Sequence, residues 1–166
     1  MSGAASNARV VVAGFGSRDR RDDGVGPLVA ALVAQQCQCV KVVGPLSDPL
    51  DLLGQWNGAD LVVVIDALRS GAPIGTLHVL EMDTCASAAK RTSHDEMGVT
   101  STHGIGLAGV VRLAHAIDQC PKRLMVVGLE GERFDFGEGL SPAVQASVPA
   151  AVSRVLAMIE EVRACA

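Results

Sequence analysis

The stretch "RVVVAGFGSRDRRDDGVGPLVAALVAQQ", residues 9–36, decides the fold. It begins with an apolar run rich in β-branched residues, passes through a glycine-bounded turn crowded with charge, and ends in a pattern typical of a helix over residues 25–36. The consecutive apolar residues from Val10 to Ala13 indicate a central strand that is covered on both faces. A strand, a turn and a helix in this order form the repeating unit of an α/β fold.

Further apolar runs predict the rest of the sheet. Strand-like runs alternate with helical patterns along the whole chain, which predicts an α/β sandwich built on a largely parallel sheet of about five strands. We predict strands at residues 9–14, 39–44, 61–66, 75–81 and 123–130, and helices at residues 25–36, 48–56, 104–118 and 142–163.

The composition restricts the class of protein. A chain of 166 residues with 49% hydrophobic and 19% charged residues predicts one domain, residues 1–166, with a sizeable core. The net charge of −4 and the scarcity of aromatic residues give no sign of a nucleic-acid partner. We find no apolar signal-peptide core and no apolar run near the roughly 20 residues of a membrane helix. We therefore expect a cytoplasmic protein without a membrane span.

The five cysteines do not form a recognisable framework. Cys37, Cys39, Cys85, Cys120 and Cys165 are odd in number and contain no CxxC pair, so the sequence predicts neither a disulfide scaffold nor a zinc ribbon. Cys37 and Cys39 are separated by one residue, a spacing that on a strand would direct them to opposite faces. We interpret the five as structural or incidental thiols.

The charged turn after the first predicted strand does not fit a phosphate-binding loop. A dinucleotide fingerprint would need its third glycine at position 19, which is Asp19, and nearby carboxylates would repel phosphate. Two uses remain for the acids that follow: Asp22 or Asp23 caps the next helix, or the pair helps to hold a cation. Pro27 fits the first turn of that helix.

Two more polar residues are expected near the same turn. Asp66 closes the apolar run "LVVVID", and His103 lies in "STHG" at the start of a predicted helix. Taken singly, each has a plain structural interpretation as a cap or turn residue. Because ligands of open α/β sheets bind at the carboxyl ends of the strands, we expect Asp23, Asp66 and His103 on three loops at one edge. Such a set of two oxygen ligands and one nitrogen ligand can bind a divalent transition metal.

The other histidines are weaker candidates for a site. His78 lies in an alternating strand pattern, His115 lies within a helical pattern, and His94 lies in the polar stretch 89–102, which we expect to be a loop beside the site. The sequence contains neither G-x-S-x-G nor H-E-x-x-H, so it does not support a serine hydrolase or a zincin.

Several separated motifs, in order, resemble the nickel-iron hydrogenase maturation endopeptidases over nearly the whole chain. Members of this family trim a C-terminal extension from the precursor of the hydrogenase large subunit. The motifs are "VVVAGFGSRDRRDDGVGP" (10–27), "ADLVVVIDALRSGAPIGTL" (59–77), "STHGIGLAGVV" (101–111), "LMVVGLEG" (124–131) and "GLSPAVQASVPAAVSRVL" (139–156).

The resemblance implies both a fold and a site. The implied fold is a three-layer sandwich, a twisted, mostly parallel sheet with helices on both faces. The family's metal ligands correspond to Asp23, Asp66 and His103, which would also be the catalytic residues. Nickel would arrive in the precursor, the expected partner, and another divalent transition metal is a possible ligand of the isolated protein.

Two positions depart from the family pattern. Ser17 stands where members usually carry Asn, and residues 43–56 replace a family Asp-Gly-Gly-Thr turn. Asp48 in this segment has two interpretations: it takes over the role of the missing acid, or it caps a turn before "PLDLLGQW". The Asp-Pro-Leu segment is similar to those of maturation proteases that serve cytosolic, nicotinamide-linked hydrogenases.

Three functions remain open at this point. The first is an endopeptidase that trims the precursor after nickel insertion, in which one of the acids activates water. The second is a non-catalytic module that checks nickel loading, and the third is a self-sufficient zinc hydrolase. Arg18, Arg20 and Arg21 are either solvated or hold a C-terminal carboxylate through bidentate hydrogen bonds.

Overall fold

The computed structural model describes residues 8–84, 100–101 and 106–165. Its short elements η1 and η2 are 3-10 helices. In chain order the elements are β1 (Val10–Phe15), η1 (Arg21–Gly24), α1 (Val25–Gln36), β2 (Lys41–Leu46), η2 (Pro49–Leu52), β3 (Leu61–Arg69), β4 (Leu77–Met82), β5 (Thr100–Ser101), α2 (Gly106–Ala116), β6 (Leu124–Glu130) and α3 (Pro142–Ala164).

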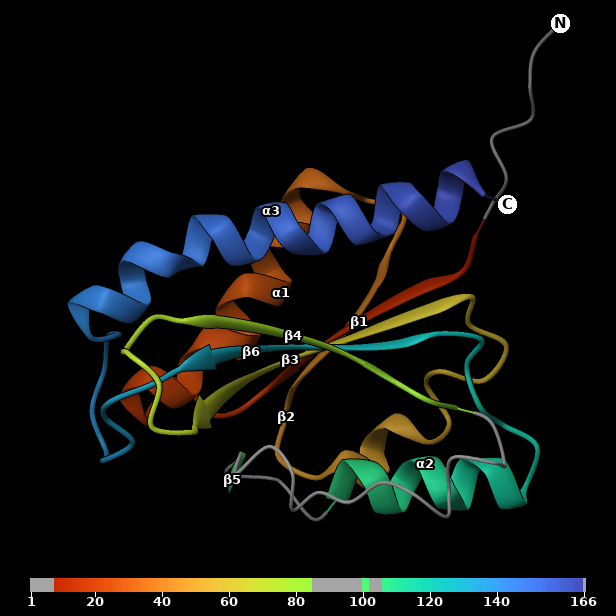
Figure 1. Cartoon of the computed structure of the whole chain (residues 1–166), viewed down its shortest axis with the longest axis horizontal. Helices are drawn as coiled ribbons and strands as arrows, with labels where there is room; N and C mark the ends of the chain where they lie inside the picture. Colours follow the sequence, from red (N-terminus) through yellow and green to blue (C-terminus); the bar gives the residue numbers. More distant parts are fainter. Residues whose placement is uncertain (1–7, 85–99, 102–105, 166) are drawn as a thin grey trace, which may run out of the picture.

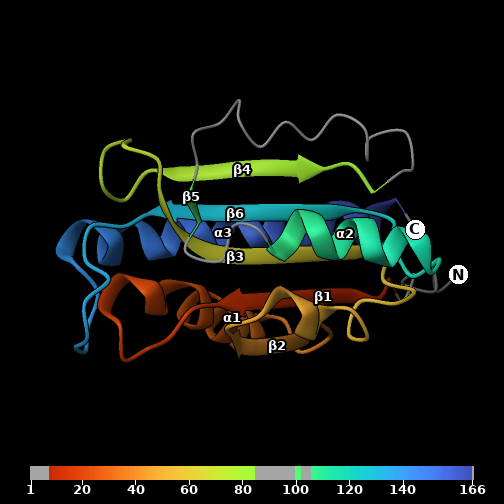
Figure 2. The same cartoon turned by 90° about the horizontal axis from the view of Figure 1, so that it is seen from below.

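One mixed sheet runs through the molecule in the order β2-β1-β3-β6-β4 (Figure 2). The pairs β1/β2, β1/β3 and β3/β6 are parallel, whereas β4 runs antiparallel to β6. The two-residue strand β5, which the sequence did not predict, pairs antiparallel with the end of β3. The prediction of a mostly parallel sheet with about five main strands is confirmed.

Helices cover both faces of this sheet (Figure 1). Helices α1 and α3 lie over one face, and α2 with η2 lies over the other. Side chains of β3 alternate between the two resulting cores: Ile65 packs with the α1 and α3 side, and Val64 packs with the α2 side. Each layer thereby buries its apolar side against the sheet, and the predicted three-layer sandwich is confirmed.

The predicted helix at residues 48–56 is mostly absent. Only η2 forms there, and the side chain of Asp48 caps it by accepting the N–H of Leu50 at 2.9 Å. Beyond η2 the chain turns so that Trp56 becomes fully buried in the core beneath α2. Tertiary packing of this tryptophan prevails over the local helical pattern. Of the two interpretations of Asp48, the structure confirms the cap.

Helix α3 is long and apolar enough, by length and composition alone, to cross a membrane. One of its sides nevertheless packs into the core shared with α1, through residues such as Val152, Val155 and Ile159. Its other side carries exposed charges, including Arg154 and Glu160. This burial pattern is that of the core helix of a layered domain.

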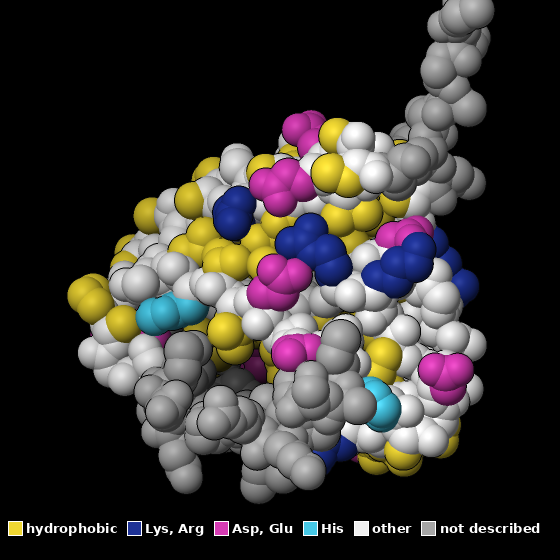
Figure 3. Space-filling view, turned by 45° about the vertical axis from the view of Figure 1, so that its right-hand side comes forward, with side chains coloured by type: hydrophobic (Ala, Val, Ile, Leu, Met, Phe, Trp, Pro, Cys, Tyr) yellow, Lys and Arg dark blue, Asp and Glu magenta, His cyan; other side chains and the backbone are white. Residues whose placement is uncertain are grey.

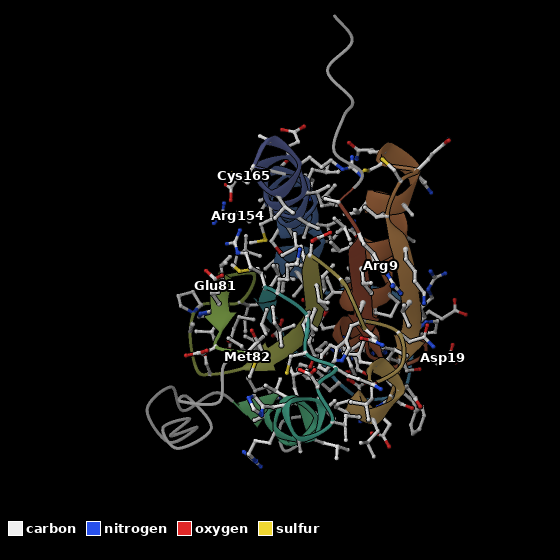
Figure 4. The ribbon with its side chains drawn as sticks, turned by 90° about the vertical axis from the view of Figure 1, so that its right-hand side faces the viewer. Arg9, Asp19, Glu81, Met82, Arg154 and Cys165 are labelled. Atoms are coloured by element: carbon white, nitrogen blue, oxygen red, sulfur yellow. The ribbon has the colours of Figure 1, made fainter. Side chains whose placement is uncertain are left out.

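Charges of both signs lie interspersed on the one face of the molecule that the space-filling view shows (Figure 3). Figure 4 views the molecule from the end at which β1 begins, with Arg9 just before that strand and Glu81 on the β4 edge. Glu81 pairs with Arg123 at 2.8 Å, and Asp60 pairs with Lys122 at 2.7 Å.

Candidate functional site

The turn between β1 and η1 holds Asp23 inside the protein. Gly16 has a φ of +112°, and a Cβ atom there would overlap the backbone carbonyl oxygen of Asp23. Only glycine therefore lets the turn fold back this closely. The N–H of Ser17 donates to Asp23 Oδ2 at 2.8 Å, and Asp23 is only 3% exposed. Any residue except proline would supply this backbone N–H, and the Ser17 hydroxyl in addition accepts the N–H of Asp19 at 3.4 Å.

Asp66 reaches the same edge of the sheet on the neighbouring strand. Gly14 of β1 pairs with Ile65 of β3, and a Cβ atom on Gly26 would collide with the carbonyl oxygen of Ile65. The start of α1 therefore lies against the backbone directly before Asp66. The segment between β1 and α1 is thus brought against β3, and η1, which contains Asp23, is in contact with that strand.

Asp66 itself is buried, with an exposed fraction of 5%, and its Oδ1 accepts the N–H of Ala67 at 2.8 Å. The prediction that Asp66 ends its strand is wrong, because β3 continues to Arg69. Pairing beyond Asp66 explains the extension: Leu68 pairs with Glu130 of β6 and with Ser101 of β5. Asp66 lies inside a paired strand, which fixes its backbone more firmly than a loop would.

His103 lies outside the described residues. The nearest described residues on its two sides are Ser101, which pairs with Leu68 on β3, and Gly106, whose backbone lies against the ring of Pro49. Among the described parts of the chain, no group of three or more His, Cys, Asp or Glu side chains is placed to hold a metal ion. The structure thus brings Asp23 and Asp66 to one edge, and the placement of His103 stays a prediction.

Asp22 does not cap α1, and neither does Asp23. Helix α1 has Gly24 at its N-cap without a side-chain hydrogen bond, because η1 runs directly into it and the N–H of Val25 already reaches Asp22 O. The Asp22 side chain, fully buried, turns to the segment before α3 instead. It accepts hydrogen bonds from the N–H groups of Glu132, Arg133 and Ser141 and from the Ser141 hydroxyl.

The environment of Asp22 favours its ionised form. Burial raises the pKa of this carboxyl, but the N–H groups of Arg133, Ser141 and Glu132 and the hydroxyl of Ser141 together lower the pKa below its ordinary value. A buried carboxylate with this many donors is a structural anchor, which the sequence did not distinguish from its neighbour Asp23.

Two of the three arginines in the turn are also structural. Arg20 Nε donates to Phe134 O at 3.3 Å, and the guanidinium lies 5.8 Å from the centroid of the exposed Phe136 ring. Arg21 Nε donates to Asp135 at 2.8 Å. Arg18 is exposed. Simple solvation is therefore wrong for Arg20 and Arg21, which help to fasten residues 131–137 beside the turn.

Glu130 is a buried carboxylate that the sequence analysis missed. It ends β6 with an exposed fraction of 2%, and its carboxylate accepts the N–H groups of Ser70 and Gly71 and the hydroxyl of Ser70. His78 Nε2 of β4 lies 3.7 Å from Glu130 Oε2. The sequence did contain a signal for this residue, because Glu130 stands at the end of an apolar run in the same way as Asp66 does. Glu130 fixes the loop after β3 and does not take part in the predicted ligand set.

The remaining weaker candidates from the sequence are two histidines, one cysteine and the expected polar loop. His115 is exposed in the last turn of α2. His94, Cys85 and residues 89–99 of the expected loop lie outside the described residues.

A sequence model described as Hydrogenase maturation protease matches residues 33–158. The chain belongs to the hydrogenase maturation protease family. The matched range includes Asp66 and His103, whereas Asp23 lies before it.

Individual members of this family align with most of the chain. The hydrogenase 2 maturation protease of Escherichia coli K12 is 26% identical over 158 residues, which cover 92% of each chain. The hydrogenase expression/formation protein HupD of Thiocapsa roseopersicina is 28% identical over 159 residues, which cover 91% of this chain and 67% of that protein.

Solved structures of family members have the same fold. The hydrogenase maturating endopeptidase HybD from E. coli superposes with a TM-score of 0.74 at 25% identity, covering 92% of this chain and 93% of that one. The [NiFe] hydrogenase maturation protease HybD from Thermococcus kodakarensis gives a TM-score of 0.72 at 23% identity, covering 90% and 98%. The α/β sandwich is therefore the family fold, and the chain belongs to a family of proteases.

Proposed function

We propose that this protein is a cytoplasmic endopeptidase that removes the C-terminal extension of a nickel-iron hydrogenase large-subunit precursor after nickel has been inserted. The observation that carries the proposal is the presence of two buried carboxylates, Asp23 and Asp66, at one edge of the sheet in a chain of this family. Burying the two acids, one in η1 and one within β3, is costly unless each is hydrogen-bonded or paired with a positive group, and buried carboxylates near one another mark a candidate functional site.

Nickel enters this proposal as cargo of the substrate. Asp23, Asp66 and His103 supply carboxylate and imidazole donors, which suit a divalent transition metal. They contact the nickel of the loaded precursor and so orient the scissile bond beside the two acids. Three protein ligands with open coordination positions bind free metal weakly, so recognition requires the nickel that the precursor already holds.

The reaction is hydrolysis of one peptide bond. A water molecule attacks the scissile carbonyl carbon, and one of the two carboxylates accepts the proton of that water. The C–N bond then breaks and the proton passes to the leaving amine. Burial of the carboxylates removes bulk water from their surroundings. Their charges therefore interact more strongly with the reacting groups than they would in water.

A cleavage assay tests the proposal directly. Nickel-loaded and nickel-free precursors of a candidate large subunit are incubated with the wild type and with Asp23→Asn, Asp66→Asn and His103→Ala, and the products are identified by mass. We expect the wild type to release a C-terminal peptide only from the nickel-loaded precursor, and each variant to lose this activity by at least about a hundredfold.

Matched substitutions separate the site from general effects. Asp48→Asn removes an acid whose capping role asparagine can also perform, and His115→Ala removes an exposed histidine of α2. Both are expected to cleave like the wild type. Precursor binding without any trimming by the wild type would instead identify a nickel-checking module. Tightly bound zinc together with hydrolysis of generic peptides would identify a zinc hydrolase and overturn the proposal.

A further inference from the structure

Two thiols meet in the turn that follows α1. Cys37 ends the helix, its N–H donating to Val33 O at 2.8 Å, and the turn continues through Cys39 to the start of β2 at Lys41. The Sγ atoms of Cys37 and Cys39 lie 3.6 Å apart. On a strand, two residues with this spacing would point to opposite faces. Cys37 and Cys39 do not, because they lie in the turn before β2 begins.

A guanidinium from a distant part of the chain completes the cluster. Arg163, near the end of α3, places Nη1 3.3 Å from Cys37 Sγ and Nη2 3.3 Å from Cys39 O. A fixed positive charge stabilises the thiolate form of a nearby cysteine. The hydrogen bond with the Cys37 thiol, followed by Arg163, holds the pKa of Cys39 below its ordinary value. Cys39 is exposed, so this thiol is also accessible.

We propose that Cys37 and Cys39 form a redox-active dithiol that exchanges with low-molecular-weight disulfides of the glutathione type. The combination on which this rests is an exposed thiol, a second thiol in contact with it, and an arginine beside both, which is the arrangement expected of a reactive cysteine with a resolving partner. The pair lies at the end of α1 away from Asp23, and the inference is independent of the proposed function.

The exchange balances in two steps. The Cys39 thiolate attacks one sulfur of glutathione disulfide, the S–S bond breaks, and one glutathione leaves as a thiolate. Cys37 then gives its proton to water and attacks Cys39 Sγ, which releases the second glutathione. Two protein thiols are oxidised to one disulfide, and one glutathione disulfide is reduced to two glutathione molecules. The two Sγ atoms must close from 3.6 Å to about 2.0 Å, a movement within reach of side-chain rotation in an exposed turn.

Trapping in defined glutathione buffers tests this inference. The full-length protein is equilibrated at several ratios of oxidised to reduced glutathione, acid-quenched, alkylated and mapped by mass spectrometry. We expect an intramolecular Cys37–Cys39 disulfide, two hydrogen atoms lighter than the dithiol, while Cys165 carries the alkyl group or a glutathione adduct. Cys165, exposed after α3 (Figure 4), is the matched single thiol.

Variants separate the roles of the three groups. Cys37→Ser should leave a persistent glutathione adduct on Cys39, because the resolving thiol is gone, and Cys165→Ser should leave the disulfide unchanged. Arg163→Gln should slow alkylation of Cys39 several-fold, and Arg163→Lys should largely restore the rate. The inference is overturned if Cys39 of the wild type reacts no faster than Cys165 and forms only glutathione adducts or stays reduced at every ratio. Fluorescence of the buried Trp56 verifies that each variant is folded.

Discussion

The buried carboxylate of Asp22 accepts both the backbone N–H and the hydroxyl of Ser141, at 2.6 and 3.0 Å, across 119 positions of the sequence. Ser141 is the N-cap residue of α3, and η1 contains both Asp22 and Asp23. The two adjacent acids therefore have different contacts: Asp22 fastens the segment before α3 to η1, whereas Asp23 accepts the N–H of Ser17 and is the acid assigned to the candidate site. A chain with only one of these acids would lose either the anchor or the candidate ligand.

Replacing Asp22 by Asn is expected to lower the free energy of unfolding by about 2–4 kcal/mol. The substitution removes a charged acceptor and puts an amide group where the surrounding atoms are donors, which leaves buried polar groups unsatisfied. Urea unfolding of wild type and variant, followed by fluorescence of the single tryptophan, measures the change. Asp135→Asn, which breaks an exposed ion pair with Arg21, should cost much less.

The stability of the wild type and that of Asp22→Asn should respond differently to acid. The pKa of Asp22 is lower in the folded protein than in the unfolded chain, so its stabilising contribution is complete above the unfolded pKa of about 3.9 and is lost as the pH falls through the folded pKa. The stability difference between wild type and Asp22→Asn should therefore be constant near neutral pH and shrink below about pH 4. A difference that stayed constant down to pH 2 would show that the pKa of Asp22 is the same in the folded protein and in the unfolded chain.

Most of the sheet could be predicted from the sequence because its strands are buried on both faces. Runs such as Val10–Ala13 carry a signal that needs no knowledge of the rest of the chain. The two-residue β5 and the short η2 have no such signal, since pairing with β3 and burial of Trp56 determine them. Contacts between distant segments decided these elements, and local pattern cannot reveal them.

The candidate site was predictable to a similar extent. The rule that ligands bind at the carboxyl ends of strands predicts Asp23 and Asp66 on loops at one edge, whereas the structure has Asp23 buried in η1 after β1 and Asp66 buried within β3. The division of labour between Asp22 and Asp23 was not predictable, because it depends on residues 132–141, which lie far along the chain. Glu130 was missed for the same reason, as its donors belong to the loop after β3.

Replacing Gly16 by Ala should disturb the turn that holds Asp23. The new Cβ atom would overlap the carbonyl oxygen of Asp23, and the positive φ would add backbone strain, so we expect a loss of at least about 2 kcal/mol in the free energy of unfolding. Precursor cleavage should fall as well, even at temperatures at which the variant is fully folded. Gly54→Ala, at a position with open space around the new atom, is the matched control and should be neutral in both assays. A fully active Gly16→Ala protein would show that catalysis does not depend on the geometry of this turn.

Replacing Glu130 by Ala should destabilise the protein by about 2–4 kcal/mol, because the partly buried N–H groups and the hydroxyl that its buried carboxylate satisfies lose their acceptor. Glu130→Gln should cost less, since one amide oxygen can still accept the N–H groups of Ser70 and Gly71. Urea unfolding gives both values. Glu81→Ala, which removes an exposed partner of Arg123, should have a smaller effect than Glu130→Ala. Equal losses from these two alanine variants would contradict a special role for the buried acid.

Replacing Phe136 by Ala should weaken binding of the precursor without weakening the fold. The Phe136 side chain is 83% exposed, yet it lies in a segment that Asp22, Arg20 and Arg21 fasten beside the turn of Asp23. An exposed aromatic ring held in place next to arginine is typical of a residue that anchors a protein partner. We expect the KM for the nickel-loaded precursor to rise about tenfold, with kcat and the free energy of unfolding nearly unchanged.

The control for Phe136→Ala is Ile117→Ala, which truncates another exposed apolar side chain, beyond the end of α2. Direct binding of the precursor to both variants separates a loss of affinity from a change in the chemical step. If Ile117→Ala weakened binding as much as Phe136→Ala, general surface hydrophobicity would explain the effect. A different result is that neither variant changes binding while the wild type still cleaves the precursor. The precursor would then approach the two acids from another side of the sheet edge. The segment 131–137 would have only a structural role, through its hydrogen bonds with Asp22.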